Sequence, residues 1–320
     1  MLDGVEQFAA GRNTVTEQYR AVAFSAFGGP EVLEVIERRV ESPGEGQVRI
    51  AVRAAGVNPL DWKLRAGAVT FIPVEFPAVP GGEVAGVITA LGPGVTRFTV
   101  GDEVLGGTTL GGYAEQVLAP ADGLTAKPSG LAWDVAAGLP IAANTAAYAL
   151  AELGLKAGET LVVDGAAGGV GTVAVQLAVQ AGATVIGTAG EANHAYLREL
   201  GATPVSYGEG LADRLRQLAP HGIDAALDAS GRGSLAALVT MAGGPQRVVT
   251  IADPAADQHG VRMIFGEPAG AAERIATVAT LAAEGRLRLP IAGTYPLEEA
   301  AQAHRVSERG HLRGKLIIKP

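Results

Sequence analysis

A glycine-rich segment between Gly165 and Gly171 holds the residues best suited to binding a ligand. It follows the apolar run Leu161 to Val163 and precedes Thr172 to Gln180, which is compatible with a helix. Glycines between a strand and a helix allow a tight turn and let the backbone approach a pyrophosphate, which the N–H groups of the helix N-terminus bind. Ala166 departs from the G-x-G-x-x-G pattern at its first position. The sequence predicts a dinucleotide site, with a plain strand-to-helix turn as the alternative, over Ala167, Gly168, Gly169, Val170 and Gly171.

The end of the next apolar run indicates which dinucleotide to expect. NAD-binding folds place an acidic residue there, which binds the 2′-hydroxyl of the ribose. In this chain the run Thr184 to Thr188 is followed by Gly190 and no acid, which leaves room for a 2′-phosphate. The sequence therefore predicts NADPH rather than NADH, with Gly190, His194 and Tyr207 as candidate neighbours. Two alternatives stay open, because Glu191 is close enough to reach a ribose and because His194 and Tyr207 also occur on ordinary surfaces.

Composition and charge exclude several classes of function. Of the 320 residues, 48% are hydrophobic and 18% are charged, which predicts two domains with a large core rather than disorder. The formal net charge of -8 argues against nucleic acid and anionic lipid as partners. The chain has no cysteine, so disulfides, thiolate nucleophiles and cysteine-ligated zinc are excluded. Without a membrane-length apolar run or a signal pattern, we expect a cytoplasmic location.

The apolar runs divide the chain into two styles. From Val32 to Val104, short β-type runs are separated by glycine and proline, as expected of a β-rich domain. After Pro140, strands and helices alternate, which predicts an α/β fold with a doubly wound parallel sheet. The expected strands are 160–163, 184–186, 225–228 and 247–251, and the expected helices begin near 170 and span 194–200. The closing stretch returns to the first style with a helix over 297–308 and a strand over 315–318, whereas residues 1–19 are interpreted as an extension or a cloning remnant.

Four segments outside the glycine loop carry a shared pattern. They are Phe27 to Leu33, which reads FGGPEVL; Ala55 to Pro59 with Asp61, Lys63, Arg65 and Gly67; Pro80 to Gly86, which reads PGGEVAG; and Asn144 to Tyr148. Together they resemble the zinc-free quinone oxidoreductase branch of the medium-chain dehydrogenase/reductase superfamily, with its alkenal and enone reductases. The resemblance extends from Arg20 to Pro320. Gly82 stands in place of a zinc-binding histidine, and Asn58 stands in place of a zinc-binding cysteine.

The resemblance implies a GroES-like β-rich catalytic domain and a Rossmann domain. The GroES-like domain would comprise residues 20–142 and 286–320, and the Rossmann domain, residues 143–285, would bind NADPH. The nicotinamide would lie in the cleft between them, and neither zinc nor another metal is expected. The family also implies a homodimer that forms through a Rossmann edge such as Val261 to Phe265.

Family positions suggest roles for individual residues. Asn58 is expected against the nicotinamide ribose or the substrate carbonyl, and Thr145 beside the nicotinamide. Lys63 stands where enone reductases carry a lysine that can stabilise or protonate an enolate. Asp61 could orient Lys63 or cap a helix, and both interpretations stay open, as do a turn-forming Asn58 and a solvated Lys63. Further residues expected at the cofactor are Ser230, Ile251, Ala252 and Phe265.

These features predict NADPH-dependent, metal-independent reduction of quinones or α,β-unsaturated carbonyls. Oxidising an alcohol needs a Lewis acid, whereas hydride addition to an electron-poor carbon places charge on an oxygen that hydrogen-bond donors can stabilise. A non-catalytic NADPH-binding protein, crystallin-like or redox-sensing, is one alternative. An enoyl-thioester reductase is another, although Arg214 and Arg216 are isolated and form no basic cluster for a carrier arm.

Overall fold

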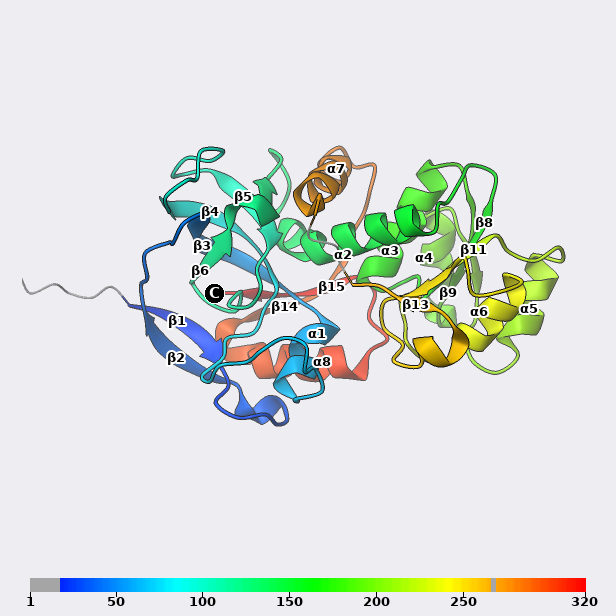
Figure 1. The fold of residues 1–320 in the computed structure, drawn as a ribbon, viewed down its shortest axis with the longest axis horizontal. Helices are drawn as coiled ribbons and strands as arrows, with labels where there is room; N and C mark the ends of the chain where they lie inside the picture. Colours follow the sequence, from blue (N-terminus) through cyan, green and yellow to red (C-terminus); the bar gives the residue numbers. More distant parts are fainter. Residues whose placement is uncertain (1–17, 266–268) are drawn as a thin grey trace, which may run out of the picture.

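The computed structural model describes residues 18–265 and 269–320, and these residues form two lobes. One lobe is built around antiparallel strands and the other around a parallel sheet, and a long helix, α2 (Trp133–Glu152), runs from one lobe to the other (Figure 1). None of the helices in this described part combines the length and apolar character that a bilayer crossing requires. The α/β fold class predicted from the sequence is confirmed.

The strands of the first lobe pair antiparallel, except β14 and β15, which pair parallel. Within the described residues, its seven-stranded sheet runs β14-β15-β3-β4-β5-β7, with β6 paired to β3, and β1 and β2 form a separate ribbon. Val48, Ile50 and Val52 of β3 alternate into the core, as a half-buried strand requires. The strands are β1 (Gln18–Ala23), β2 (Glu34–Arg39), β3 (Gln47–Val57), β4 (Glu83–Leu91), β5 (Glu103–Gly107), β6 (Gln116–Pro120), β7 (Leu124–Ala126), β14 (Ile291–Pro296) and β15 (Lys315–Lys319). Helices α1 (Pro59–Arg65) and α8 (Ala300–Arg309) belong to this lobe.

The second lobe is a doubly wound parallel sheet. Its strand order among the described residues is β10-β9-β8-β11-β12-β13, and every neighbouring pair is parallel. The order reverses between β8 and β11, and ligands of such sheets bind outside the carboxyl ends at this reversal. The strands are β8 (Thr160–Asp164), β9 (Thr184–Thr188), β10 (Thr203–Val205), β11 (Ala225–Asp228), β12 (Val248–Thr250) and β13 (Arg262–Met263). The helices are α3 (Gly169–Gln180), α4 (His194–Glu199), α5 (Leu211–Leu218), α6 (Leu235–Met241) and α7 (Ala271–Ala283).

Helix α2 packs against both lobes. It contacts β3, β4 and β5 on one side and α3 and α7 on the other, through a surface rich in buried alanine. Small side chains allow this close approach, and a Cβ on Gly138 would lie only 3.3 Å from Cβ of Lys315. The boundary expected at residue 142 falls inside this continuous helix. The residue limits of the two domains therefore stay a proposal.

Several element boundaries differ from the predicted ones. Strand β1 already begins at Gln18, so Gln18 and Tyr19 belong to the strand and not to an extension, while residues 1–17 lie outside the described residues. The helix expected over 297–308 starts with a tighter turn, η5 (Leu297–Glu299), before α8. Other short 3₁₀ turns in the described chain are η1 (Pro30–Val32), η2 (Ala121–Gly123), η3 (Glu191–Asn193) and η4 (Ala256–His259). Strand β15 pairs antiparallel with β3, which places the closing segment in the first lobe.

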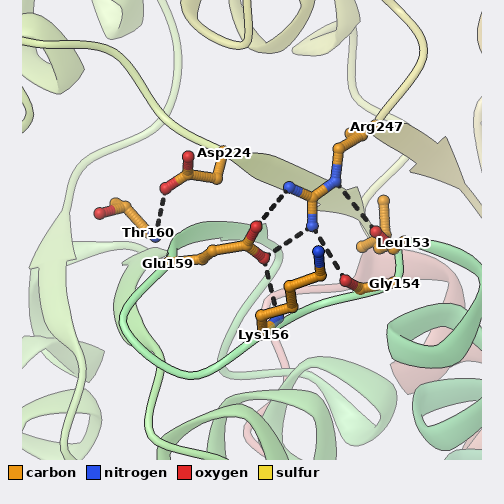
Figure 2. Close-up of polar contacts among 7 residues, drawn as sticks. All are labelled: Leu153, Gly154, Lys156, Glu159, Thr160, Asp224 and Arg247. Atoms are coloured by element: carbon orange, nitrogen blue, oxygen red, sulfur yellow. Dashed lines mark hydrogen bonds and ion pairs between the residues drawn. The ribbon is translucent and has the colours of Figure 1, made fainter.

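An ion pair fastens the amino edge of the parallel sheet (Figure 2). The Arg247 guanidinium donates to both carboxylate oxygens of Glu159 at 2.7 Å and to the carbonyls of Leu153 and Gly154. The backbone N–H of Lys156 also donates to Glu159, at 2.8 Å. These hydrogen bonds, with that to Arg247 strongest, lower the pKa of Glu159 to about 2. The loop that ends α2 is thereby tied to the start of β12.

Candidate functional site: a dinucleotide loop beside a buried polar cluster

The glycine loop lies where the strand order of the parallel sheet reverses. It leaves β8 and enters α3, with Gly168 immediately before the helix. A Cβ on Gly171 would lie 2.3 Å from the carbonyl oxygen of Gly165, so glycine is required there. The first N–H groups of a helix have no partners within the helix, and here they are available to an anion. The predicted loop, Ala167 to Gly171, is therefore positioned to bind a pyrophosphate.

Polar side chains at the ends of four adjacent strands support this loop. The Asp164 carboxylate accepts hydrogen bonds from the hydroxyls of Thr188 and Ser230. Asp228 accepts from the Thr250 hydroxyl at 2.8 Å and from the Ser230 N–H at 2.9 Å. Burial raises the pKa of Asp228, and the charge of Asp164 adds to this effect. Sequence reasoning found Ser230 but missed both acids, although each ends a buried apolar strand.

The two residues after β12 that were expected at the cofactor lie at the same edge. The Ala252 N–H donates to the Thr250 hydroxyl at 3.1 Å, and Ile251, which precedes it, is half-buried. A Cβ on Gly231 would lie 2.6 Å from the Ala252 carbonyl oxygen, so the loops after β11 and β12 are in direct contact. Backbone from both strands therefore lines the carboxyl edge beside the glycine loop.

A second polar group lies beyond the end of β9. A Cβ on Gly190 would lie 3.8 Å from Oη of Tyr207, which places Tyr207 where a 2′-phosphate is expected. His311 Nδ1 is 3.3 Å from the same Oη, and Arg232 lies 3.3 Å from His311 Nε2. Sequence reasoning missed Arg232 and His311 because both are remote in sequence from Tyr207. His194 lies nearby but its Nε2 contacts the carbonyl of Ala189, at 3.2 Å.

Asn58 lies in a buried cluster with Glu83 and Lys315. Its Nδ2 donates to Glu83 Oε1 at 2.9 Å, and its Oδ1 accepts from Lys315 Nζ at 2.6 Å. Lys315 also donates to Glu83, and the Ile141 N–H donates to the other Glu83 oxygen at 2.7 Å. All three side chains are almost completely buried. Lys315 was not predicted, although a lysine heading the apolar strand KLII was a visible signal.

A hydrogen-bonded chain holds Asp61 next to Asn58. Asp61 accepts from the Asn58 N–H at 2.8 Å and from the Tyr113 hydroxyl at 3.0 Å. His304 lies 3.3 Å from the Tyr113 oxygen and 3.5 Å from Arg65. Burial raises the pKa of Asp61 to about 6, while burial and then Arg65 lower the pKa of His304 to about 3. Asp61 thus caps α1, which is one of the two roles considered, and its hydrogen bonds do not involve Lys63.

The other candidate residues lie around this cluster. Lys63 is half-buried, with Nζ 5.7 Å from the ring centroid of Trp62, and it is not part of the Asn58 cluster. Thr145 is buried within α2. Phe265 is 55% exposed, and its ring centroid lies 5.1 Å from that of Phe71, which comes from the other lobe. Phe71 was not singled out in the sequence.

The donor set around Asn58 does not fit a zinc ion. Zinc sites in proteins use thiolate, imidazole and carboxylate ligands, whereas this cluster offers a carboxamide and one carboxylate. The ammonium of Lys315 lies between these two groups and would repel a cation. In the described part of the chain, no three histidine, aspartate or glutamate residues gather as metal ligands.

Two family models match the chain. The alcohol dehydrogenase GroES-like domain matches residues 44–129, and a zinc-binding dehydrogenase domain matches residues 200–318. The second model is named after zinc, but its match, residues 200–318, includes neither Asn58 nor Gly82, which the sequence resemblance places at zinc-ligand positions.

Full-length relatives and solved structures agree with these matches. The chloroplast envelope quinone oxidoreductase homolog of Arabidopsis thaliana is 31% identical, over 94% of this chain and 98% of the relative. A mycocerosic acid synthase-like polyketide synthase of Mycolicibacterium smegmatis is 33% identical over 99% of this chain, which corresponds to 16% of that protein. The Escherichia coli quinone oxidoreductase complexed with NADPH has a TM-score of 0.85 and 25% identity, covering 94% of this chain and all of that one. The chain therefore belongs to the quinone oxidoreductase branch of the medium-chain dehydrogenase/reductase superfamily and is an oxidoreductase.

Proposed function

We propose that this protein reduces quinones or α,β-unsaturated carbonyls with NADPH and without a metal. The observation that carries the proposal is the buried Asn58, Glu83 and Lys315 cluster beside the dinucleotide loop. It offers hydrogen-bond donors and no Lewis acid, which suits an acceptor whose oxygen gains charge as it is reduced. An alcohol substrate would need help in losing its proton, and this cluster does not supply it.

The preference for NADPH rests on the group beyond β9. Tyr207 and Arg232, linked to each other through His311, can donate hydrogen bonds to a 2′-phosphate, and no carboxylate ends β9 to bind a ribose hydroxyl. Charge-assisted bonds of this kind contribute about 1.5 to 3 kcal/mol each. The similar quinone oxidoreductase of Escherichia coli was solved in complex with NADPH, which supports the same cofactor here.

The residues of the chain have separate tasks in this reaction. When bound, NADPH would supply a hydride, which adds to the electron-poor carbon of the acceptor and moves an electron pair onto its oxygen. Asn58 donates a hydrogen bond to that oxygen, and Thr145 packs beside the reacting groups. Lys63, on the same helix as Asp61, supplies a proton to the enolate. Phe265, whose ring lies against that of Phe71 from the other lobe, shields the nicotinamide.

A second candidate function is reduction of an enoyl thioester. The match to a mycocerosic acid synthase-like polyketide synthase over nearly the whole chain favours it. The reaction is the same conjugate reduction as that of an enone, with a thioester carbonyl in place of a ketone or aldehyde. A panel of acceptors that includes both classes separates them.

The test is NADPH oxidation by chelator-treated protein with benzoquinone, phenanthrenequinone, simple enones and enoyl thioesters, and with NADH for comparison. We expect turnover that persists under chelation and a preference for NADPH of about tenfold or more. Asn58→Ala should lower kcat, whereas the control Arg216→Met, on the exposed face of α5, should not. Binding of NADPH without turnover of any acceptor would overturn the proposal in favour of a non-catalytic protein.

We also propose that the protein is a homodimer that works in the cytoplasm. Strand β13 is one of the two edge strands of the parallel sheet, and an edge strand can pair with the same strand of a second copy. Light scattering after size-exclusion chromatography measures the mass directly, and a monomer would contradict the dimer.

A further inference from the structure

The ammonium group of Lys315 is buried, and its side chain lies between Asn58 and the glycine loop. The Lys315 side chain is 5% exposed and makes an ion pair with Glu83, which is fully buried. Lysine is rarely buried to this extent unless it is paired. Replacing such a pair by apolar residues is often neutral or stabilising, so stability alone does not explain its presence.

Lys315 and Glu83 together determine how the Asn58 carboxamide is oriented. An ammonium group can only donate, so the atom of Asn58 that faces it must be the oxygen. The amide nitrogen is then directed to Glu83, as the 2.6 Å and 2.9 Å contacts show. A carboxamide nitrogen carries two N–H groups, and Glu83 takes one of them. The other remains as a donor for a ligand.

The same lysine lies against the dinucleotide loop. The N–H of Gly314, which precedes it, donates to the Ala167 carbonyl at 2.9 Å, and Gly314 forms a β-bridge with Gly168. A Cβ on Gly169 would lie 2.7 Å from Cδ of Lys315, so the lysine stem fills the space beside the first turn of α3. One residue therefore contacts both the loop and Asn58.

We propose that Lys315 is a positioning residue for Asn58. It fixes the carboxamide in the orientation whose second N–H serves the acceptor oxygen, and Glu83 holds the lysine in place. The aliphatic part of the Lys315 side chain packs against the glycine loop, so it holds Asn58 at a fixed position relative to the bound dinucleotide. This inference rests on the proposed reductase function and assigns to it a residue that does not itself touch the acceptor.

The kinetic test is a double-mutant cycle between Lys315→Met and Asn58→Ala. Methionine keeps the length of the stem and removes the ammonium. We expect each single variant to lower kcat about tenfold to a hundredfold with little change in acceptor KM, and the double variant to be no slower than Asn58→Ala. Additive losses, or an unchanged kcat in Lys315→Met, would overturn the inference.

Two further variants test whether the loss of any charge on β15, or a loss of folding, explains the result. Lys319→Met removes a charge from the same strand at an exposed position paired with Asp134, and it should keep wild-type kcat. The doubly neutral Lys315→Met, Glu83→Gln protein avoids an unpaired buried carboxylate, so it stays folded if Lys315→Met alone does not. It should show the same loss of kcat, and wild-type turnover in this protein would also overturn the inference.

A measurement without turnover separates this inference from the proposed function. In protein labelled with ¹⁵N-asparagine, the Asn58 side-chain amide is identified by its loss in Asn58→Ala. We expect two resolved side-chain amide protons in wild type and in Lys319→Met, with the one bonded to Glu83 protected from exchange, and loss of that protection in Lys315→Met. Unchanged protection in Lys315→Met would contradict the positioning role. An inactive wild type with the expected spectra would refute the reductase function alone.

Discussion

The amino edge and the carboxyl edge of the parallel sheet differ in how their charged groups are compensated. At the amino edge, Arg247 and Glu159 neutralise each other in a two-pronged ion pair that ties loops together (Figure 2). At the carboxyl edge, Asp164 and Asp228 lie directly opposite each other in register on adjacent strands, two like charges without an ion-pair partner among the contacts of the described residues. The Ser230 hydroxyl and the backbone N–H groups of Ser230 and Gly231, in the loop after β11, donate hydrogen bonds to them instead.

This difference separates structure from function within one sheet. Hydrogen bonds, chiefly from Arg247, lower the pKa of Glu159, whereas burial and then a neighbouring acid raise the pKa of Asp228. Electrostatically unfavourable groupings persist in proteins mainly where a site needs them. We therefore expect changes at the carboxyl edge to affect the cofactor and changes at the amino edge to affect only stability.

The largest effect is expected from crowding the dinucleotide loop. Gly171→Ala places a Cβ against the Gly165 carbonyl oxygen, which cannot move without distorting the turn. We expect NADPH to bind about tenfold or more weakly, as measured by quenching of protein fluorescence. Gly123→Ala, whose Cβ would meet its nearest atom at an ordinary 3.5 Å, is the matched control. Wild-type affinity in Gly171→Ala would show that this loop does not hold the cofactor.

A smaller and more selective effect is expected beyond β9. Arg232→Met removes the guanidinium beside His311 but keeps an apolar stem. The Kd for NADPH should rise about tenfold, since one charge-assisted bond is lost, while the Kd for NADH stays within about twofold. Calorimetric titration of both nucleotides measures this. An equal loss for the two would place Arg232 away from the 2′-phosphate.

The paired acids should leave a signature in the pH dependence of stability. Because the folded-state pKa of Asp228 is raised above 3.8, its contribution favours folding at low pH and is lost as pH rises through the folded-state value. Asp164→Asn removes the neighbouring charge, so the variant should lose less stability than wild type as pH rises from about 4 to about 7. We expect the difference in Tm between Asp164→Asn and wild type to change by about 2 to 4 °C, in favour of the variant, over this pH range.

The exposed acid Asp213 provides the control for this measurement. Asp213→Asn lies in the same lobe, outside the paired acids, and should give the wild-type slope of Tm against pH. Parallel slopes for Asp164→Asn and wild type would mean that the two buried acids do not interact.

The smallest effect on function is expected at the amino edge. Glu159→Gln should lower Tm near pH 7 by about 2 to 4 °C and leave the NADPH Kd and kcat within about twofold of wild type. The pKa of Glu159 is depressed, so its stabilisation is present above 4.5 and is lost as pH falls toward about 2. The Tm difference should shrink over that range. A change in the NADPH Kd of Glu159→Gln would contradict the expected difference between the amino edge and the carboxyl edge.

Local patterns in the sequence determined much of the molecule. The strands of the parallel sheet were recognisable because each is a short apolar run bounded by glycine or polar residues, and β11 spans the predicted 225–228. The glycine loop was recognisable because its backbone requirements act within seven residues. The absence of cysteine also needed no structure.

Contacts between remote residues were decided only by the tertiary structure. Lys315 reaches Asn58 across 257 positions, and His311 reaches Tyr207 across 104. Periodicity and spacing carry no information on such pairs, because they depend on how β15 pairs with β3 and how the loops after separate strands pack. The sequence therefore specified the loop proposed to bind the dinucleotide and the residue proposed to face the acceptor, whereas packing of the two lobes decided which charged groups surround them.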